Sequence, residues 1–371
     1  MDEWENLLKQ LPDTLETSHK MDNPSQELII HKGLIYLKLD EIVQKHEDST
    51  IVLKWEPYFQ YNLIINNCNG LFHLGNSEKI LYFSINGEKY FEGRFWELND
   101  KGSHFLIKSI EFGEKPIKLK EAYFDLPNVN VFIGVATKKD RGFTRNRLSI
   151  TTKDFNFYLD LDQKSDEIKL MLKNKGGTFI NARCLLNYKR TISFEKLIVE
   201  TQSLNYYLSF IFGRWTSSFC IEVPNTNYKY YFSPYVARYI YPSNKFNLKI
   251  EGASLNLSYC NFSKMWKVDS ERHFLKKIIE WYSEISILQV QHEIGIILGQ
   301  SCLELMYNHL IKNKNVYLIG RDASDIASEN KIRLLLSNFG INSILPDKYD
   351  KIKNKYFSKG TLVDGPMTIV K

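Results

Sequence analysis

The sequence has few cysteines and pairs none of them. Five occur in 371 residues, and none forms a C-x-x-C motif. Isolated cysteines are usually small buried hydrophobic residues. The chain begins Met1-Asp2-Glu3-Trp4-Glu5, an acidic start that does not look like a secretion signal. We therefore expect a reducing, cytoplasmic compartment and no disulfide framework.

Long hydrophobic runs are also missing. The longest apolar-leaning stretch covers residues 294–310, and polar residues or glycine interrupt it at Gly299, Gln300, Ser301, Glu304 and Asn308. A membrane-spanning helix needs about 20 mostly apolar residues. We therefore expect no membrane partner.

The common cofactor and metal signatures do not occur. The sequence holds neither G-x-x-x-x-G-K-[ST] nor G-x-G-x-x-G, the loops that cradle phosphates. His292-Glu293 lacks the second histidine of a zinc protease motif, and Cys and His nowhere cluster at ligand spacing. We expect no cofactor and no metal site. A run of acidic residues comprises Asp160, Asp162, Asp166 and Glu167. The run lacks the glycine that a calcium-binding loop requires at its sixth position, so we expect a solvated strand end and turn there.

The composition is that of a folded, multi-domain chain. Hydrophobic residues make up 43% and charged residues 25% of 371 residues, which predicts two or three domains. The 22 tyrosines and 23 phenylalanines favour β-sheet surfaces. A net charge of +6 permits nucleic-acid binding without requiring it.

The hydrophobic pattern predicts an α+β fold, with a β-rich sandwich or open barrel followed by an all-α bundle. Residues 1–27 indicate a short helix that ends at Pro12, then a linker over 20–27. Residues 28–265 are expected to form the β-rich module: the pattern has period two from about 28 to 190, with a hairpin at Asn86-Gly87, where both turn positions would need φ > 0. One helix interrupts this module at about 194–212, with Ser193 as its N-cap and Gly213 as its stop. Strands are expected again from 215 to about 257.

From residue 266 to 371 the pattern is helical. A first helix is capped at Asp269 or Ser270, and a second, over about 288–312, is apolar nearly all round, which is typical of a central buried helix. A third covers 328–338 and ends at Gly340, and a short fourth begins at Pro346. Asp364-Gly365-Pro366 is a turn with proline at a favoured first helical position, and Lys371 lies only about one turn later. A lone turn of helix is unstable, so we expect either a truncated helix or a frayed tail.

A basic cluster surrounds Gly142 and includes one aromatic residue, Phe143. Such cations neutralise phosphates, and an aromatic ring can stack on a base. The alternative is an exposed hairpin loop that is merely charged. The candidate nucleic-acid-binding residues are Lys138, Lys139, Arg141, Arg145 and Arg147.

The second helix of the helical region carries a polar stripe at spacings of seven, four and four: Glu293, Gln300, Glu304 and Asn308. The stripe would line an active cleft or form the solvent face of the helix. His309 flanks it and is a candidate general base, although no acidic residue lies one helical turn away on either side.

Several segments recur in an order and spacing that are familiar from a known family. They are 179–190, Ser193-Phe194-Glu195-Lys196, 207–213, the region around Trp266, the helix 274–282, Ile296 to Leu305, Lys331 to Leu336 and Val363-Asp364-Gly365-Pro366. In these segments, over about residues 150–371, the chain resembles a bacterial family of phage-defence proteins, the ApeA-like group with a C-terminal HEPN domain.

The resemblance implies a metal-independent ribonuclease that forms homodimers through its helical domain. In such proteins an Arg and a downstream His cleave RNA: the His serves in acid/base chemistry and the Arg stabilises the phosphorane. No Arg of this sequence has a His five to seven residues downstream, and the expected position lies directly beyond Lys371. The resemblance thus implies a truncated chain that does not cleave RNA by itself. Glu304, Asn308 and His309 would then be supporting residues, Glu304 foremost.

Two functions follow from these patterns. In the first, the chain is a toxin-type or anti-phage ribonuclease whose β-rich half senses a phage-derived trigger or a partner protein. In the second, it is a non-catalytic protein that binds nucleic acid, a small ligand or a partner. A weaker third possibility, carbohydrate binding, rests only on the aromatic run 228–232.

Overall fold

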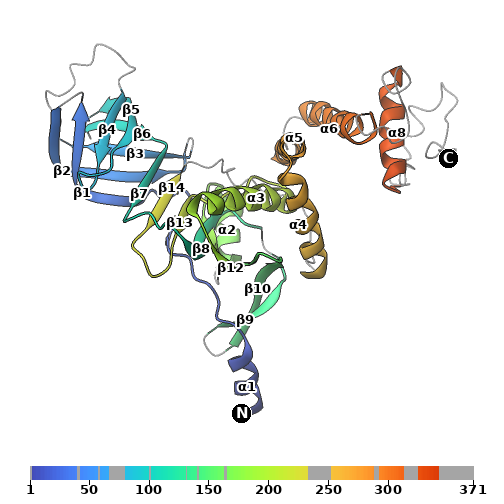
Figure 1. The fold of residues 1–371 in the computed structure, drawn as a ribbon, viewed down its shortest axis with the longest axis horizontal. Helices are drawn as coiled ribbons and strands as arrows, with labels where there is room; N and C mark the ends of the chain where they lie inside the picture. The colour runs from blue at the N-terminus through green and yellow to red at the C-terminus, as the bar shows by residue number, and fades with distance from the viewer. Residues whose placement is uncertain are drawn as a thin grey trace. The chain divides into compact units, whose positions relative to one another are not determined.

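Figure 1 shows the computed structural model of the chain, which forms two compact units, Met1–Lys267 and Val268–Lys371. The structure describes residues 2–39, 42–56, 59–66, 80–99, 102–130, 132–139, 142–162, 165–232, 252–287, 292–312 and 325–341. The expected helix starts at Pro346 and Pro366, and Lys371, lie outside the described residues. Together the units confirm the α+β fold class.

The first unit begins with a closed barrel of six antiparallel strands in the order β1-β2-β3-β6-β5-β4. The strands are β1 (Leu28–Leu39), β2 (Ile42–Lys54), β3 (Gln60–Ile65), β4 (Ile80–Ser84), β5 (Phe91–Asn99) and β6 (Gly102–Ile107). Alternate side chains point inward, which is why the period-two pattern was visible in the sequence. Buried members of this core include Ile35, Leu37, Leu63, Phe83 and Phe105.

The predicted hairpin at Asn86-Gly87 forms, but its turn differs from the expected one. Strands β4 and β5 pair antiparallel, with Phe83 opposite Phe91. Gly87 has φ of 83°, whereas Asn86 is not among the residues with positive φ. The Asn86 side chain instead accepts a hydrogen bond from the backbone N–H of Glu88 at 3.1 Å. The turn is therefore wider than the two-residue type and is stabilised by an asparagine side chain.

An eight-stranded antiparallel sheet follows, in the order β7-β14-β13-β8-β12-β11-β10-β9. Its strands are β7 (Ser109–Phe112), β8 (Leu119–Pro127), β9 (Val135–Lys139), β10 (Gly142–Thr151), β11 (Phe155–Leu161), β12 (Ile180–Ile192), β13 (Cys220–Glu222) and β14 (Lys229–Phe232). Tyr61 of the barrel donates a hydrogen bond to the carbonyl of Phe219 at 2.8 Å. Barrel and sheet thus share one buried cluster within this unit.

Helix α3 (Phe194–Phe212) has both predicted ends. The Ser193 side chain accepts from the N–H of Lys196, and Gly213 adopts the left-handed conformation, with φ of 63° and ψ of 28°. Leu197, Leu204 and Leu208 form its buried stripe. The local capping signals were sufficient to place this helix.

Two further helices of this unit were not predicted. Helix α2 (Ser165–Lys175) occupies a region expected to be strand and turn, and helix α4 (Gly252–Trp266) begins where strands were expected to continue. In α4 the buried residues recur at spacings of four, three and four, namely Leu255, Tyr259, Phe262 and Trp266. That period is helical, so the expectation of strands to residue 257 was wrong.

The N-terminal segment is not a free linker. After helix α1 (Asp2–Gln10), Pro12 and Thr14 exchange backbone hydrogen bonds with Lys138 of β9. Farther along the segment, the N–H of Ser25 donates to the carbonyl of Thr178, just before β12, at 2.6 Å. Met21 is buried on the way. Residues 20–27 form no helix or strand, but the contacts of Met21 and Ser25 anchor this stretch to the sheet, which the sequence pattern did not predict.

The second unit contains helices α5 (Asp269–Ile287), α6 (His292–Tyr307) and α8 (Ser328–Asn338), and a π-helical turn, η1 (Asn308–Lys312), that continues α6. As predicted, α8 is followed by Gly340 in the left-handed region, with φ of 64°. The described hydrophobic core of the second unit lies between the end of α6, η1 and α8, and its buried residues are Tyr307, Ile311, Leu334 and Leu335.

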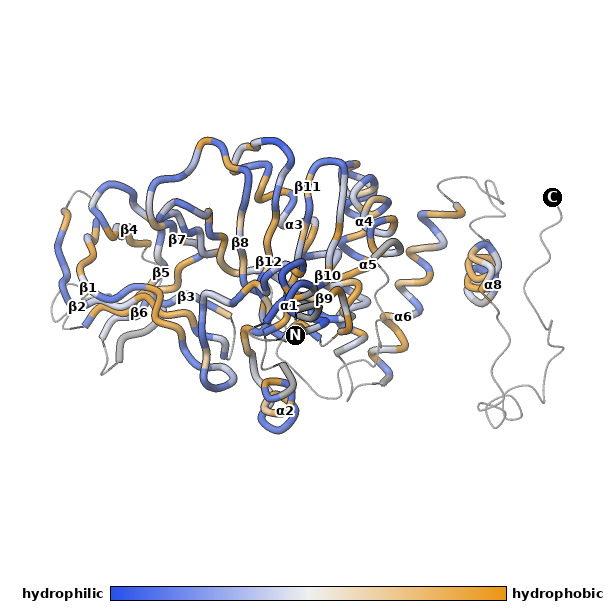
Figure 2. Tube along the Cα trace, turned by 90° about the horizontal axis from the view of Figure 1, so that it is seen from below, coloured by the Kyte–Doolittle hydropathy of each residue, from blue (hydrophilic) through white to orange (hydrophobic). Residues whose placement is uncertain are grey.

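Helix α6 is not buried along its whole length. Figure 2 shows apolar residues along α6, yet Ile296 is 69% exposed and Ile297 62% exposed. Only its last turns pack into the described core. Among the described residues, no helix has the length and apolarity that crossing a membrane requires.

Candidate functional site

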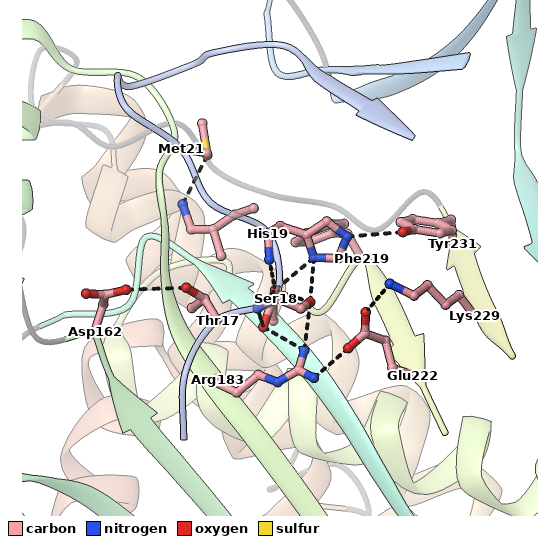
Figure 3. A network of polar contacts seen from close by, with 12 residues as sticks. Thr17, Ser18, His19, Met21, Asp162, Arg183, Phe219, Glu222, Lys229 and Tyr231 are labelled. Atoms are coloured by element: carbon pink, nitrogen blue, oxygen red, sulfur yellow. Dashed lines mark hydrogen bonds and ion pairs between the residues drawn. The ribbon is translucent and has the colours of Figure 1, made fainter. Parts of the chain in front are cut away.

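A buried polar network joins the N-terminal segment to the centre of the sheet (Figure 3). Its hub is the Asp125 carboxylate on β8, whose side chain is fully buried. His19 Nδ1 lies 2.8 Å from Asp125 Oδ2, and the backbone N–H groups of Ser18 and His19 donate to the same oxygen. Because a carboxylate only accepts, His19 donates through Nδ1, and its Nε2 lies 3.1 Å from the Tyr231 hydroxyl.

The charges of this network balance in pairs. Arg183 on β12 donates through Nη1 to Asp125 Oδ1 at 2.9 Å and through Nη2 to Glu222 on β13. Lys229 Nζ lies 2.8 Å from the other oxygen of Glu222. Two carboxylates thus meet two cations across four strands.

These contacts shift the pKa values of the acids. Burial by itself would raise the pKa of Asp125, but the hydrogen bond from His19 and the charge of Arg183 outweigh burial and lower it. The same competition lowers the pKa of Glu222, where Lys229 and Arg183 oppose burial. Both side chains are therefore held as carboxylates at neutral pH.

His19, Cys220 and Glu222 place donor atoms within 4.8 Å of one another, so their geometry could hold a metal ion. Their existing partners argue against it. Both Glu222 oxygens face cations, and His19 uses both ring nitrogens. A further positive charge beside Arg183 and Lys229 would be repelled. The donor set does not fit a metal ion well, and we assign none here.

The network also does not form a nucleophilic site. Cys220 is 1% exposed, and burial raises the pKa of its thiol well above its usual value. A nucleophilic cysteine needs a lowered pKa and access to substrate. The arrangement instead pins residues 17–19 onto the sheet. No sequence motif marks it, because its members lie up to 212 residues apart.

A second buried pair lies farther along the sheet and corrects two expectations. Arg147 donates to both oxygens of Asp160 at 2.7 and 2.6 Å, and also to the carbonyl of Asp13. Asp160 is fully buried, so it is not part of a solvated turn. Arg147 is 7% exposed and its charge is engaged. It is therefore not part of an exposed nucleic-acid-binding cluster.

The remaining basic candidates lie on the β9–β10 hairpin. Lys138 pairs opposite Phe143 and Lys139 opposite Gly142. Both lysines are half-buried, Arg145 is exposed, and the Phe143 ring is 47% exposed. Arg141 lies outside the described residues. Directly paired residues share a face of the sheet, so Phe143 lies on the same face as Lys138, and Lys139 lies on the other face.

In the helical unit, Glu304 joins two helices. The Ser328 hydroxyl at the start of α8 donates to Glu304 Oε1 on α6 at 2.6 Å. This hydrogen bond lowers the pKa of Glu304, and nearby Lys331 adds to the effect. The exposure of the polar stripe decreases along the helix: Glu293 and Gln300 are exposed, whereas Asn308 at the start of η1 is half-buried.

His309 has an acidic partner that its own helix does not supply. Its Nε2 lies 2.9 Å from Glu271 Oε2 on α5, and its ring stacks on Phe274 with centroids 3.9 Å apart and planes at 11°. Within the described residues no hydrogen bond engages its Nδ1. The partner was missed because Glu271 is 38 residues away and meets His309 only through packing of α5 on α6.

Comparisons with known proteins add two matches. Residues 114–242, which hold most of the eight-stranded sheet, match the YopA central domain, and residues 269–371 match the YopA C-terminal domain. No curated protein and no solved structure matches the chain significantly. The matched domains are described as YopA domains, and the similarity to ApeA-like HEPN proteins stays a prediction. Two successive stretches of the chain are therefore similar to the central and C-terminal domains of YopA.

Proposed function

We propose that the helical unit is the HEPN-like part of a metal-independent ribonuclease of the toxin or anti-phage kind. In this proposal the β-rich unit senses a trigger, two helical units pair as a homodimer, and the protein acts in the cytoplasm on RNA. Glu304, Asn308 and His309 support the catalytic Arg and His that the resemblance implies.

The observation that carries the proposal is the fixed His309 at a π-helical turn. The π-helix is rare, and its single turns are frequently found at functional sites. Glu271 and Phe274 of α5 hold the imidazole from two sides, at 2.9 Å and 3.9 Å. Glu304, which precedes His309 on the same helix, accepts a hydrogen bond from the Ser328 hydroxyl at 2.6 Å. Supporting groups of a catalytic site need such fixed rotamers.

Metal-independent RNA cleavage requires that the reacting groups be positioned and that protons be transferred to and from them. RNA cleavage without a metal requires a base for the 2′-hydroxyl, an acid for the leaving oxygen and a cation for the phosphorane. A carboxylate such as Glu304 orients an Arg by bidentate hydrogen bonding, because the two groups match in geometry. His309, with Glu271 on Nε2, leaves Nδ1 for another partner.

The test is RNA cleavage by the natural gene product, purified in EDTA, with Glu304→Gln and His309→Gln as variants and His273→Gln, at an exposed histidine on α5, as the control. We expect each of the first two to lower kcat by at least tenfold, to leave RNA affinity within twofold and to change the pH profile. Equal cleavage by all four proteins at every pH would refute the roles of these residues. No cleavage by the unaltered gene product would refute the nuclease.

A second candidate, non-catalytic nucleic-acid binding, is favoured by the β9–β10 hairpin. Its exposed Phe143 lies opposite Lys138 and two residues from the exposed Arg145, and base stacking on an aromatic ring contributes about 1–3 kcal/mol. Phe143→Ala should then weaken single-stranded RNA binding by roughly tenfold or more. Lys138→Gln should reduce the salt dependence of binding. Unchanged RNA affinity and salt dependence in both variants would show that the hairpin is not the RNA-binding site.

A further inference from the structure

The N-terminal arm, residues 12–21, crosses four neighbouring strands of the eight-stranded sheet. Beneath the arm lies a row of alternating charges, which we call the charged row: Arg147 on β10, Asp160 on β11, Arg183 on β12 and Asp125 on β8. Each of the four residues pairs directly with the next in strand register. Directly paired residues share a face of the sheet, so the four side chains lie together on the face that the arm contacts.

At one end, the charged row binds backbone atoms of the arm. Arg147 Nη2 donates to the carbonyl of Asp13 at 2.8 Å, and Asp160 Oδ2 accepts from the N–H of Leu15 at 2.7 Å. Every residue has a carbonyl and every residue except proline has an N–H. These two contacts therefore depend on an extended backbone and little on the sequence of the arm.

The other end of the charged row binds the arm in a similar way. The N–H groups of Ser18 and His19 donate to Asp125 Oδ2 at 3.1 and 3.0 Å. Arg183 Nη1 donates to the Ser18 hydroxyl at 3.0 Å (Figure 3). Counted from Leu15, the N–H groups that meet Asp125 lie three and four residues farther along the arm.

The arm also extends the sheet at its edge strand, β9. Lys138 donates through its N–H to the carbonyl of Pro12 at 2.8 Å, and its carbonyl accepts from the N–H of Thr14 at 3.2 Å. Asp13 thereby forms a parallel bridge with Lys138. Addition of an extended chain to the edge of a sheet is a recurring mode of peptide recognition.

The charged row keeps its charges paired without the arm. Arg147 donates to both oxygens of Asp160 at 2.7 and 2.6 Å, and Arg183 donates to Asp125 at 2.9 Å. An uncompensated buried charge would be strongly destabilising. Because the four charges compensate one another, departure of the arm leaves none of them without a countercharge.

The arm itself is held mainly by polar contacts. Only Thr17 and Met21 of its ten residues are buried, and Thr17 donates to Asp162 at 3.3 Å. An extended chain from another protein offers the same backbone donors and acceptors. Few apolar side chains therefore tie this particular segment to the sheet.

We propose that the charged row and the edge of β9 form a groove that binds an extended segment of a partner protein, and that the N-terminal arm competes for this groove. The partner segment presents backbone N–H groups to Asp160 and Asp125 and adds to the edge of β9. This role deepens the sensing function proposed for the β-rich unit and rests on it, since the partner segment belongs to the trigger. Peptide binding is measured without RNA, so a failure here and a failure of the nuclease are distinguishable.

The test is fluorescence anisotropy of a labelled synthetic peptide, residues 11–25, with the intact protein and its His19→Ala variant. Losing the contact between the imidazole and Asp125 loosens the arm and increases the fraction of molecules with an open groove. Apparent affinity scales with that fraction. We expect the peptide to bind His19→Ala roughly tenfold or more tightly than it binds the unaltered protein.

Backbone recognition is tested by methylating single amide nitrogens of the peptide. Methylation at Leu15 removes the N–H that Asp160 accepts and should weaken binding to His19→Ala about tenfold. Methylation at Glu16, whose N–H forms no hydrogen bond within the described residues, is the matched control and should leave the affinity unchanged. Equal affinity of the two methylated peptides would refute recognition by the charged row.

A disulfide lock shows where the peptide binds. The hydroxyl oxygens of Thr14 and Thr137 lie 2.7 Å apart, so Thr14→Cys with Thr137→Cys should close a disulfide that holds the arm on β9. The oxidised protein should bind the peptide roughly tenfold or more weakly than the same protein after reduction. This comparison retains His19 and does not depend on the folding of His19→Ala.

Three results would overturn the proposal. Equal binding by the oxidised and reduced proteins would place the peptide outside the groove. A disulfide that joins two chains, seen as a dimer on a non-reducing gel, would reassign the groove to the arm of a second copy. No change in anisotropy with any of these proteins at millimolar concentration would refute the groove, whether or not the gene product cleaves RNA.

Discussion

Replacing Arg183 with methionine removes the central cation of the buried network while keeping an apolar stem. The guanidinium lies over the Tyr123 ring at 5.1 Å and contacts both Asp125 and Glu222. Methionine retains part of the packing against that ring. Asp125, which is fully buried, keeps His19 and two backbone N–H groups but loses its strongest countercharge.

The expected loss is large for a single substitution. Removing one partner of a buried ion pair lowers the free energy of unfolding by about 3–5 kcal/mol. Because Asp125 keeps its hydrogen bond from His19, we expect Arg183→Met to lie near the lower end, at about 3 kcal/mol. In a unit of this size, each kcal/mol lowers Tm by about 2–4 °C, so Tm should fall by roughly 6–12 °C. Urea unfolding followed by circular dichroism measures the free energy directly. Arg94→Met, at an exposed pair with Glu92, should cost less than about 1 kcal/mol.

The pH dependence identifies the cause. The pKa of Asp125 is lowered in the folded protein. Its contribution to stability is therefore present above the unfolded pKa of about 3.9 and is lost as pH falls through the folded value. In Arg183→Met the pKa of Asp125 rises, so the difference in stability between the two proteins should shrink as pH falls, and it should go on shrinking below about 3.9, where the unaltered protein loses the contribution of Asp125. A loss below about 1 kcal/mol, or one that does not change with pH, would refute the reasoning.

Other predictions concern single contacts. Gly213→Ala should destabilise the first unit by about 1–2 kcal/mol in urea unfolding, because φ of 63° strains an L-residue, and an unchanged midpoint would count against the cap. Burial raises the pKa of the Cys220 and Cys184 thiols, so neither should react with a thiol reagent at about pH 8 until the unit unfolds, and rapid native labelling would contradict their burial. Ser328→Ala should raise the pKa of Glu304 in an NMR titration, since the lowering hydrogen bond is lost, and an unchanged value would remove that assignment.

Local signals predicted those parts of the fold that depend on neighbours in sequence. Ser193 and Gly213 delimit α3 because capping uses residues three or four positions away. The period-two pattern likewise predicted β-rich structure before residue 190. Helix α4 could have been predicted from the sequence but was not, because the spacing of Leu255, Tyr259 and Phe262 is already that of a helix.

The sites themselves depend on contacts that no local pattern encodes. His19 meets Asp125 across 106 residues because β8 lies at the centre of the sheet, and strand order is a property of the whole topology. Arg147 belongs to a basic stretch in the sequence, yet β10 turns it toward Asp160 on β11. Whether a cation is free or paired therefore follows from strand register, which composition does not reveal.

The proposal of a metal-independent ribonuclease is tested most directly by one measurement. The natural gene product and its His309→Gln variant are incubated with single-stranded RNA in excess EDTA, and cleavage is followed on a denaturing gel with mass-spectrometric analysis of the ends. The proposal predicts cleavage by the unaltered protein, with 2′,3′-cyclic phosphate ends, and cleavage at least tenfold slower in the variant. Intact RNA with the unaltered protein, or cleavage that appears only when a divalent metal is added, would contradict it.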